Sequence, residues 1–271
     1  MALVNKIIPF SCIDGPGNRT AIFFQGCNFK CTYCHNPETI NKCINCKRCI
    51  SVCPVKALDI ENEKVIWNES KCVQCDRCIR ECSHLSTPKT KNLSVDELFN
   101  EIKEISPFIQ GITVSGGECT LNADFLIDLF KKVKNELGLT CFVDTNGGID
   151  LSEYEELVDI TDKFMLDVKS IDEDEHIKVT GTSNNIVLKN LKYLLAKNKL
   201  YEVRTVIAPN LDNEKTVLEV SKIIKDKCKY KFNAYRKYGV RKEGIDLHGE
   251  VGPSEEEINN LKSLCKDVSN F

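Results

Sequence analysis

The sequence predicts an α/β protein with a parallel sheet of six strands, which a cysteine-rich insertion interrupts. Short apolar segments alternate along the chain with amphipathic segments of helical period, as in repeated βα units. Each crossover of such a unit returns the chain to the same end of the sheet, so the strands are expected to be parallel. The cysteines indicate the insertion, because 11 of the 16 fall between Cys27 and Cys82.

The elements of the sheet and its helices follow one another in order. Six apolar segments predict the strands: Thr20–Gln25, Gly111–Ser115, Thr140–Asp144, Lys163–Val168, Glu202–Ile207 and Lys231–Tyr235. Six amphipathic segments predict the helices: Val95–Ile105, Asp124–Leu137, Leu151–Asp159, Asn185–Lys197, Glu214–Lys227 and Glu255–Val268. Ser94 and Ser254, each with a glutamate three residues later, predict capping boxes, and Gly138 predicts a helix end. Six strands are too few to close an eight-stranded barrel, so we expect a partial barrel, with an open doubly wound sheet as the alternative.

The composition limits the location and the partners of the protein. A hydrophobic fraction of 42% and a charged fraction of 28% are those of a soluble globular protein. A net charge of −3 gives no reason to expect nucleic acid. The longest apolar runs, such as Ala21–Phe24, fall far short of the roughly 20 residues that cross a bilayer, and Met1–Pro9 carries no secretory signal. We therefore expect a cytoplasmic protein with neither nucleic acid nor membrane as a partner.

Residues 37–91 form the predicted insertion, and residues 1–36 and 92–271 form the predicted barrel. The motif C-x-x-C-x-x-C-x-x-x-C occurs twice in the insertion, 29 residues apart. Such a run ligates two 4Fe-4S clusters, and the fourth cysteine of each half binds the other cluster. Cluster A is then expected at Cys43, Cys46, Cys49 and Cys82, and cluster B at Cys53, Cys72, Cys75 and Cys78. A pair of zinc sites is the alternative.

A third cysteine motif precedes the insertion. Cys27, Cys31 and Cys34 have no fourth cysteine close in the sequence. Three protein ligands on a four-iron cluster leave one iron open, where a substrate can bind. A zinc site is the alternative, although structural zinc usually takes four ligands. The other cysteines are expected to be small buried hydrophobic residues: Cys12, Cys119, Cys141, Cys228 and Cys265.

The sequence around this third motif resembles a known family. Asp14-Gly15-Pro16-Gly17-Asn18-Arg19, followed by Gly26-Cys27 and by Tyr33-Cys34-His35-Asn36-Pro37, is similar to the signature of the glycyl radical enzyme activases. These oxidoreductases belong to the radical SAM superfamily, where SAM is S-adenosylmethionine, and the opening Val4–Gly17 is most like the YjjW-type activases. The resemblance implies a partial (β/α)6 radical SAM barrel with an inserted bacterial-ferredoxin-like double 4Fe-4S domain. SAM would chelate the open iron of the cluster at the catalytic cysteines.

The resemblance also implies the residues that bind SAM. Gly116, Gly117 and Glu118 match the GGE loop, which binds the SAM amino group; a tight turn is the alternative. Asp144-Thr145-Asn146-Gly147 and Leu166-Asp167-Val168-Lys169 are similar to the DTNG and LD-x-K motifs. From these, a monovalent cation is expected at Asp144, Thr145 and Asp167. The expected SAM contacts are Tyr33, Gly116, Gly117, Glu118, Asp144, Asp167, Lys169, Arg204 and Tyr235. For Arg204 an ion pair with a neighbouring carboxylate is the alternative, and Tyr235 stands where relatives carry a histidine.

These positions agree with the strand prediction. Cys27, Gly116, Asp144, Asp167 and Tyr235 fall at or just beyond the carboxyl ends of predicted strands, which is where parallel barrels bind ligands.

The resemblance implies an oxygen-sensitive enzyme with three 4Fe-4S clusters. It would cleave SAM reductively to a 5′-deoxyadenosyl radical, which abstracts hydrogen from a glycine of a partner glycyl radical enzyme. A flavodoxin or ferredoxin would donate electrons through the insertion. Asp14 and Arg19 are candidates for contact with the partner's glycine loop, with a structural turn as the alternative. Two other functions stay open: a radical SAM enzyme acting on a small molecule, and an iron–sulfur electron-transfer protein.

Overall fold

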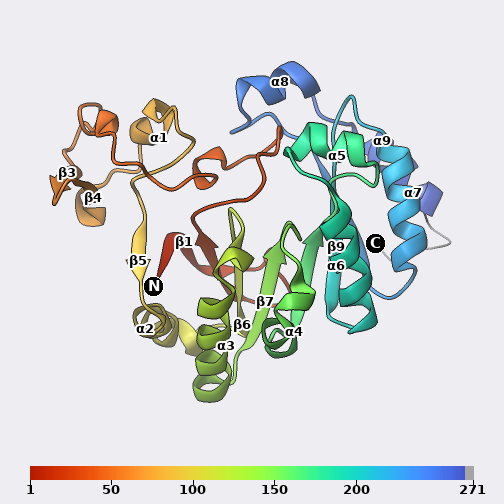
Figure 1. The fold of residues 1–271 in the computed structure, drawn as a ribbon, viewed down its shortest axis with the longest axis horizontal. Helices are drawn as coiled ribbons and strands as arrows, with labels where there is room; N and C mark the ends of the chain where they lie inside the picture. The colour runs from red at the N-terminus through yellow and green to blue at the C-terminus, as the bar shows by residue number, and fades with distance from the viewer. Residues whose placement is uncertain (266–271) are drawn as a thin grey trace.

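The computed structural model describes residues 1–265, and its centre is one eight-stranded sheet. Six parallel strands stand side by side in chain order (Figure 1): β2 (Arg19–Phe24), β6 (Gly111–Gly116), β7 (Thr140–Thr145), β8 (Lys163–Asp167), β9 (Leu200–Ile207) and β10 (Lys229–Ala234). A doubly wound sheet would reverse its strand order about a switch point, and this sheet does not. The partial barrel is therefore confirmed.

Two further strands extend the sheet beyond β2 and were not predicted. β1 (Ala2–Ser11) pairs antiparallel with β2, and β5 (Lys91–Leu93) pairs antiparallel with β1. In β1 only Ala2 and Val4 are fully buried, so the strand lacks a regular apolar alternation. The prediction of a purely parallel sheet is thus wrong at this edge, where the sheet is mixed.

Helices cover the outer face of the barrel (Figure 1): α2 (Val95–Ile105), α3 (Ala123–Leu137), α4 (Glu155–Ile160), α6 (Asn185–Ala196), α7 (Asn213–Ile224) and α9 (Glu255–Cys265). Side chains such as Phe99 and Phe130 join the buried core between helices and sheet. Reciprocal hydrogen bonds confirm the capping boxes at Ser94 and Ser254. Gly138 ends α3 in the left-handed conformation, as predicted.

The remaining helical predictions need small corrections. The segment expected as one helix from Leu151 is a 3-10 turn, Leu151–Glu153, followed by α4. The predicted end of the last helix at Val268 lies outside the described residues. Within the described part of the barrel, two helices were not predicted, α5 (Glu173–Thr180) and α8 (Lys242–His248). No helix within residues 1–265 is long and apolar enough to span a membrane.

The insertion lies beside the carboxyl ends of the barrel strands, at the upper left of Figure 1. It contains α1 (Arg77–Glu81) and a small hairpin of β3 (Leu58–Glu61) and β4 (Lys64–Trp67). Its sequence repeat is also a conformational repeat. Left-handed backbone conformations at Asn45, Lys47 and Lys56 recur 29 residues later at Gln74, Asp76 and Leu85.

Candidate active site and cysteine-lined cavities

A cavity of about 730 Å³ opens at the carboxyl ends of the parallel strands. Cys27, Cys31 and Cys34 all line this cavity. Eight of the ten predicted SAM and cation residues line it as well: Tyr33, Gly116, Gly117, Glu118, Asp144, Thr145, Asp167 and Lys169. Arg204 and Tyr235 are the two that do not. Asn233 and Arg236 line the cavity in their place, although nothing in the sequence singled them out.

Hydrogen bonds fix the loop that carries the three cysteines. The amides of Gly26 and Cys27 donate to the carbonyls of Thr39 and Ile40, both at 2.8 Å. The Phe29 amide, at 3.4 Å, and the Asn146 side-chain amide, at 3.6 Å, donate to the Cys27 sulfur. Burial raises the pKa of the Cys27 thiol to about 12. A ligand that needs the thiolate must therefore displace a proton that burial holds in place.

Gly116 and Gly117 bring the end of β6 against the end of β2. A Cβ on Gly116 would lie 2.2 Å from the Phe24 nitrogen, and one on Gly117 would lie 2.3 Å from the Gly26 carbonyl oxygen. Only glycine allows this approach of two backbones. The GGE loop is therefore packed directly on the cysteine loop.

The Glu118 carboxylate is buried and accepts four hydrogen bonds from the protein. Its donors are the Thr120 amide and hydroxyl, the Thr145 hydroxyl and the Asn146 amide, at 3.0, 2.6, 2.8 and 2.7 Å. Burial raises the pKa of this carboxyl group. Glu118 thus joins the ends of β6 and β7, a role beyond the SAM contact that the sequence predicts.

We expect Glu118→Ala to destabilise the protein as well as to weaken SAM binding. Two hydroxyls and two amides lose their acceptor, and each buried polar group left unpaired costs about 1–3 kcal/mol. Urea unfolding should detect the loss of stability, and calorimetry the loss of SAM affinity. Glu136→Ala, an exposed glutamate of α3, is the matched control. Wild-type stability in the Glu118 variant would show that these four bonds contribute nothing.

Charged side chains form a network on the inner face of β7 to β9. Arg204 donates to Asp144 at 3.0 Å and also hydrogen-bonds Glu202, which is the ion-pair alternative expected for this arginine. Lys169 donates to Asp167 at 2.5 Å. Burial raises the pKa of Asp144 to about 6, while Arg204 opposes that rise and Asp167 adds to it. Arg204 therefore reaches the cavity only through Asp144.

Tyr235 and Arg19 do not have the roles that the sequence predicts, contact with SAM and contact with a partner. The Tyr235 hydroxyl donates to the Gly249 carbonyl at 2.9 Å, so the side chain holds the following loop. Arg19 is 1% exposed and stacks on the Phe142 ring, with its guanidinium carbon 4.2 Å from the ring centre. Burial leaves Arg19 no surface for a partner. Asp14 is half-buried, and its carboxylate accepts a hydrogen bond from Ser11.

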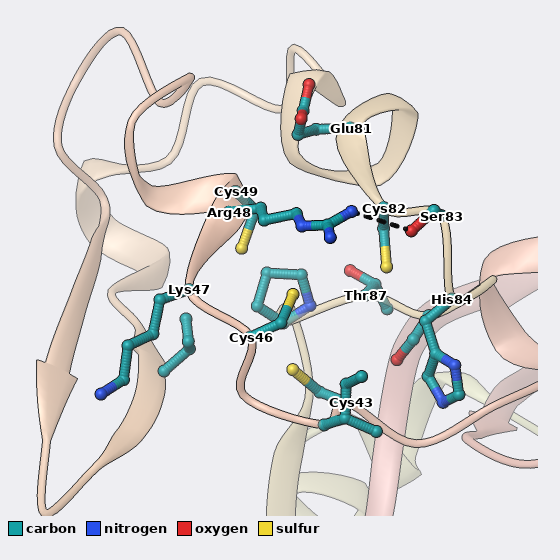
Figure 2. Close-up of a pocket in the computed structure, with 14 residues that line it drawn as sticks. Cys43, Cys46, Lys47, Arg48, Cys49, Glu81, Cys82, Ser83, His84 and Thr87 are labelled. Carbon is teal, nitrogen blue, oxygen red and sulfur yellow. Dashed lines mark hydrogen bonds between the residues drawn. The ribbon is translucent and has the colours of Figure 1, made fainter.

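Two more cavities lie in the insertion, and cysteines line both. Cavity A, of about 170 Å³, is lined by Cys43, Cys46, Cys49 and Cys82, whose thiols point into one space (Figure 2). Cavity B, of about 20 Å³, is lined by Cys53, Cys72, Cys75 and Cys78. Each cavity takes three cysteines from one half of the repeat and the fourth from the other half. The structure thus brings together the two sets that the spacing predicts.

Each of the three cysteine-lined cavities also has one buried polar atom without a hydrogen-bond partner among the described residues. These atoms are the Tyr33 hydroxyl in the large cavity, the Ser86 hydroxyl at cavity A and the Trp67 indole nitrogen at cavity B. A buried donor without an acceptor is costly. Sulfur acceptors inside the cavities would satisfy these donors.

The cysteines outside the cavities are mostly buried, as expected. Cys119, Cys141, Cys228 and Cys265 are buried, whereas Cys12 is exposed and departs from the expectation. The Cys119 thiol donates to the Asp144 carbonyl at 3.4 Å, so it packs behind the cavity wall.

Comparison with known proteins identifies the class. A family model described as the radical SAM superfamily matches residues 21–222, and the chain belongs to this superfamily. The fold agrees: the crystal structure of Streptococcus suis SuiB has a TM-score of 0.58 at 13% identity, over 90% of this chain and 44% of that one.

The curated relatives narrow the class. The chain is 34% identical to the trans-4-hydroxy-L-proline dehydratase activating enzyme of Clostridioides difficile, over 99% of this chain and 97% of the relative. It is 32% identical to the pyruvate formate-lyase-activating enzyme of Streptococcus mutans, over 97% and 90%. Within the superfamily, the chain is a member of the glycyl-radical enzyme activating enzymes.

Proposed function

We propose that this chain activates a glycyl radical enzyme by cleaving SAM reductively and removing a hydrogen atom from a glycine of that partner. One observation carries the proposal: Cys27, Cys31 and Cys34 line a single cavity together with the GGE, DTNG and LD-x-K residues. The relatives support the same reaction, because both are named as activating enzymes of other enzymes. A radical SAM enzyme acting on a small molecule is the second candidate.

The residues of the large cavity fit a 4Fe-4S cluster bound by three cysteines. Amides directed at the Cys27 sulfur, and a buried Tyr33 hydroxyl with no partner among the described residues, suit the hydrogen bonding that such clusters use. When bound, the cluster supplies the electron that splits SAM into methionine and a 5′-deoxyadenosyl radical, and the radical takes the glycine hydrogen.

The chain's own residues bind and orient SAM. The Gly116–Gly117 backbone lies against the cysteine loop, where it can accept from the SAM amino group. The Lys169 ammonium lies 5.9 Å from the centre of the Tyr33 ring and offers a cation to the SAM carboxylate. Asp144, Thr145 and Asp167 offer oxygen ligands to a monovalent cation. Arg204 acts by holding Asp144, and Tyr235 has no place in this set.

For the insertion, residues 37–91, we propose two 4Fe-4S clusters that relay electrons from a flavodoxin or ferredoxin. The crossed cysteine sets of cavities A and B support this ligation. The backbone repeat supports it as well, because the residues on either side of Cys46 and those on either side of Cys75 all have left-handed conformations. The Asn45 amide donates to the Cys43 sulfur at 3.4 Å, and the Ala57 amide to the Cys53 sulfur at 3.2 Å. A pair of zinc sites, each built from one half alone, would not cross in this way.

The test is anaerobic incubation of the holoenzyme with SAM, reductant and the glycyl radical enzyme of the same cell. Electron paramagnetic resonance (EPR) should show a carbon-centred doublet on the partner, which collapses when the partner's glycine is deuterated at Cα. Deuterium should then appear in 5′-deoxyadenosine. Deuterium arriving instead from a small metabolite, with no protein radical, would establish the second candidate.

A further inference from the structure

The walls of cavities A and B differ at equivalent positions of the repeat. The segment after Cys82 lines cavity A, and the segment 29 residues earlier, after Cys53, lines cavity B. Cavity A is lined there by Ser83, His84, Ser86 and Thr87. The counterparts at cavity B are Val55, Ala57 and Leu58. One wall is polar, and the other is apolar.

Ser86 and Ala57 carry the clearest difference. They occupy equivalent positions, 29 residues apart, and they are 1% and 2% exposed. The Ser86 hydroxyl has no hydrogen-bond partner among the described residues. Such a buried hydroxyl costs about 1–3 kcal/mol unless it finds an acceptor. The sulfurs of the four cysteines are among the acceptors that line cavity A, and Ala57 has no hydroxyl to offer to cavity B.

We propose that Ser86 donates a hydrogen bond to a sulfur of cluster A and raises the reduction potential of that cluster. The inference rests on the proposed two-cluster insertion. A hydrogen bond to sulfur stabilises the reduced, more negative cluster, and this raises the potential. The buried cation at cavity B, Lys89, is paired with Asp76 at 2.5 Å and also donates to Gln74 at 3.0 Å, so its charge is largely compensated.

The polar wall of cavity A is hydrogen-bonded to the segment that leads to the active-site loop. The Asn41 side-chain amide donates to the His84 carbonyl at 2.8 Å, and the Asn41 backbone amide to the Leu85 carbonyl at 3.0 Å. The residue before Asn41, Ile40, accepts from the Cys27 amide. The polar wall is thus tied to the loop of the active-site cysteines. Ser86 thus favours reduction of the cluster at the end of the insertion that adjoins the SAM cavity.

The test exchanges the two side chains in the full-length, anaerobically reconstituted enzyme. EPR-monitored redox titration should show that Ser86→Ala lowers the midpoint potential of cluster A alone. Ala57→Ser should raise the midpoint potential of cluster B, and the double exchange should produce both shifts. Ser86→Thr, which keeps the hydroxyl, should retain the wild-type potential. A Cys43→Ala variant identifies the signal of cluster A, and Cys27→Ala/Cys31→Ala/Cys34→Ala that of the active-site cluster.

The outcomes separate this inference from the proposed function. About 12 irons per chain with unmoved potentials in both Ser86→Ala and Ala57→Ser would overturn the role of Ser86 and leave the two clusters standing. Equal shifts of both insertion clusters would overturn it as well. About four irons per wild-type chain would show that the insertion holds no clusters. The proposed clusters of the insertion and the proposed role of Ser86 would then both be wrong.

Discussion

Replacing Cys27, Cys31 and Cys34 together by alanine is expected to abolish SAM cleavage. The three thiols line the cavity that the SAM residues share, and no other cysteine lines it. Three clusters of four irons give about 12 irons per wild-type chain, so the variant should keep about 8. Elemental analysis measures the iron, and chromatography of the reaction mixture measures 5′-deoxyadenosine.

The control for this prediction is Cys12→Ala, because Cys12 is exposed and lines none of the three cavities. That variant should keep full iron and full activity. Production of 5′-deoxyadenosine by the triple variant would disprove the site assignment. Zinc in place of iron would favour the alternative metal at all three motifs.

Replacing Arg19 by methionine is expected to lower the free energy of unfolding by about 3 kcal/mol. The guanidinium donates to the Thr113 hydroxyl at 2.8 Å, to the Ile112 carbonyl at 2.6 Å and to Thr140 at 2.9 and 3.1 Å. Methionine fills much of the volume but leaves the buried Ile112 carbonyl and the partly buried Thr140 carbonyl without that donor. Urea unfolding of the reconstituted protein measures the loss.

The control is Lys231→Met, which removes an exposed cation from β10, at the opposite edge of the same sheet. It should change stability by less than about 0.5 kcal/mol. If Arg19→Met keeps its stability but binds the partner more weakly, that result would support the partner contact expected from the sequence. If stability falls and the folded fraction binds the partner normally, Arg19 is structural.

The parallel strands β2 and β6 to β8 could be predicted because most of their residues are buried on both sides. All six predicted strands agree with β2 and β6 to β10 within two residues at each end. A strand covered by helices on one face and by the barrel interior on the other is a continuous apolar run, such as Phe164 to Leu166. β1 has a solvated face and a weak alternation, and its pairing with β2 therefore gave no local signal.

The two sets of cysteines in the insertion could be predicted for a related reason. The two halves of the insertion share a spacing of cysteines, and that spacing suffices to expect Cys82 beside Cys43 and Cys53 beside Cys72. The cavities group the cysteines in this way. The spacing of the cysteines is a local property of the chain, so it can be read directly from the sequence.

The sequence by itself determined the barrel strands, the loop of Cys27, Cys31 and Cys34, and the crossed sets of cysteines, since each follows from a period or a spacing along the chain. Only the tertiary structure decided which polar side chains face a cavity. Arg19 was expected to contact the partner's glycine loop, and Arg204 and Tyr235 were expected to contact SAM. Other residues of the chain, Thr140, Asp144 and Gly249, occupy their polar groups instead. A buried polar side chain takes whichever partner the packing brings within hydrogen-bond distance, and that partner cannot be identified from local sequence.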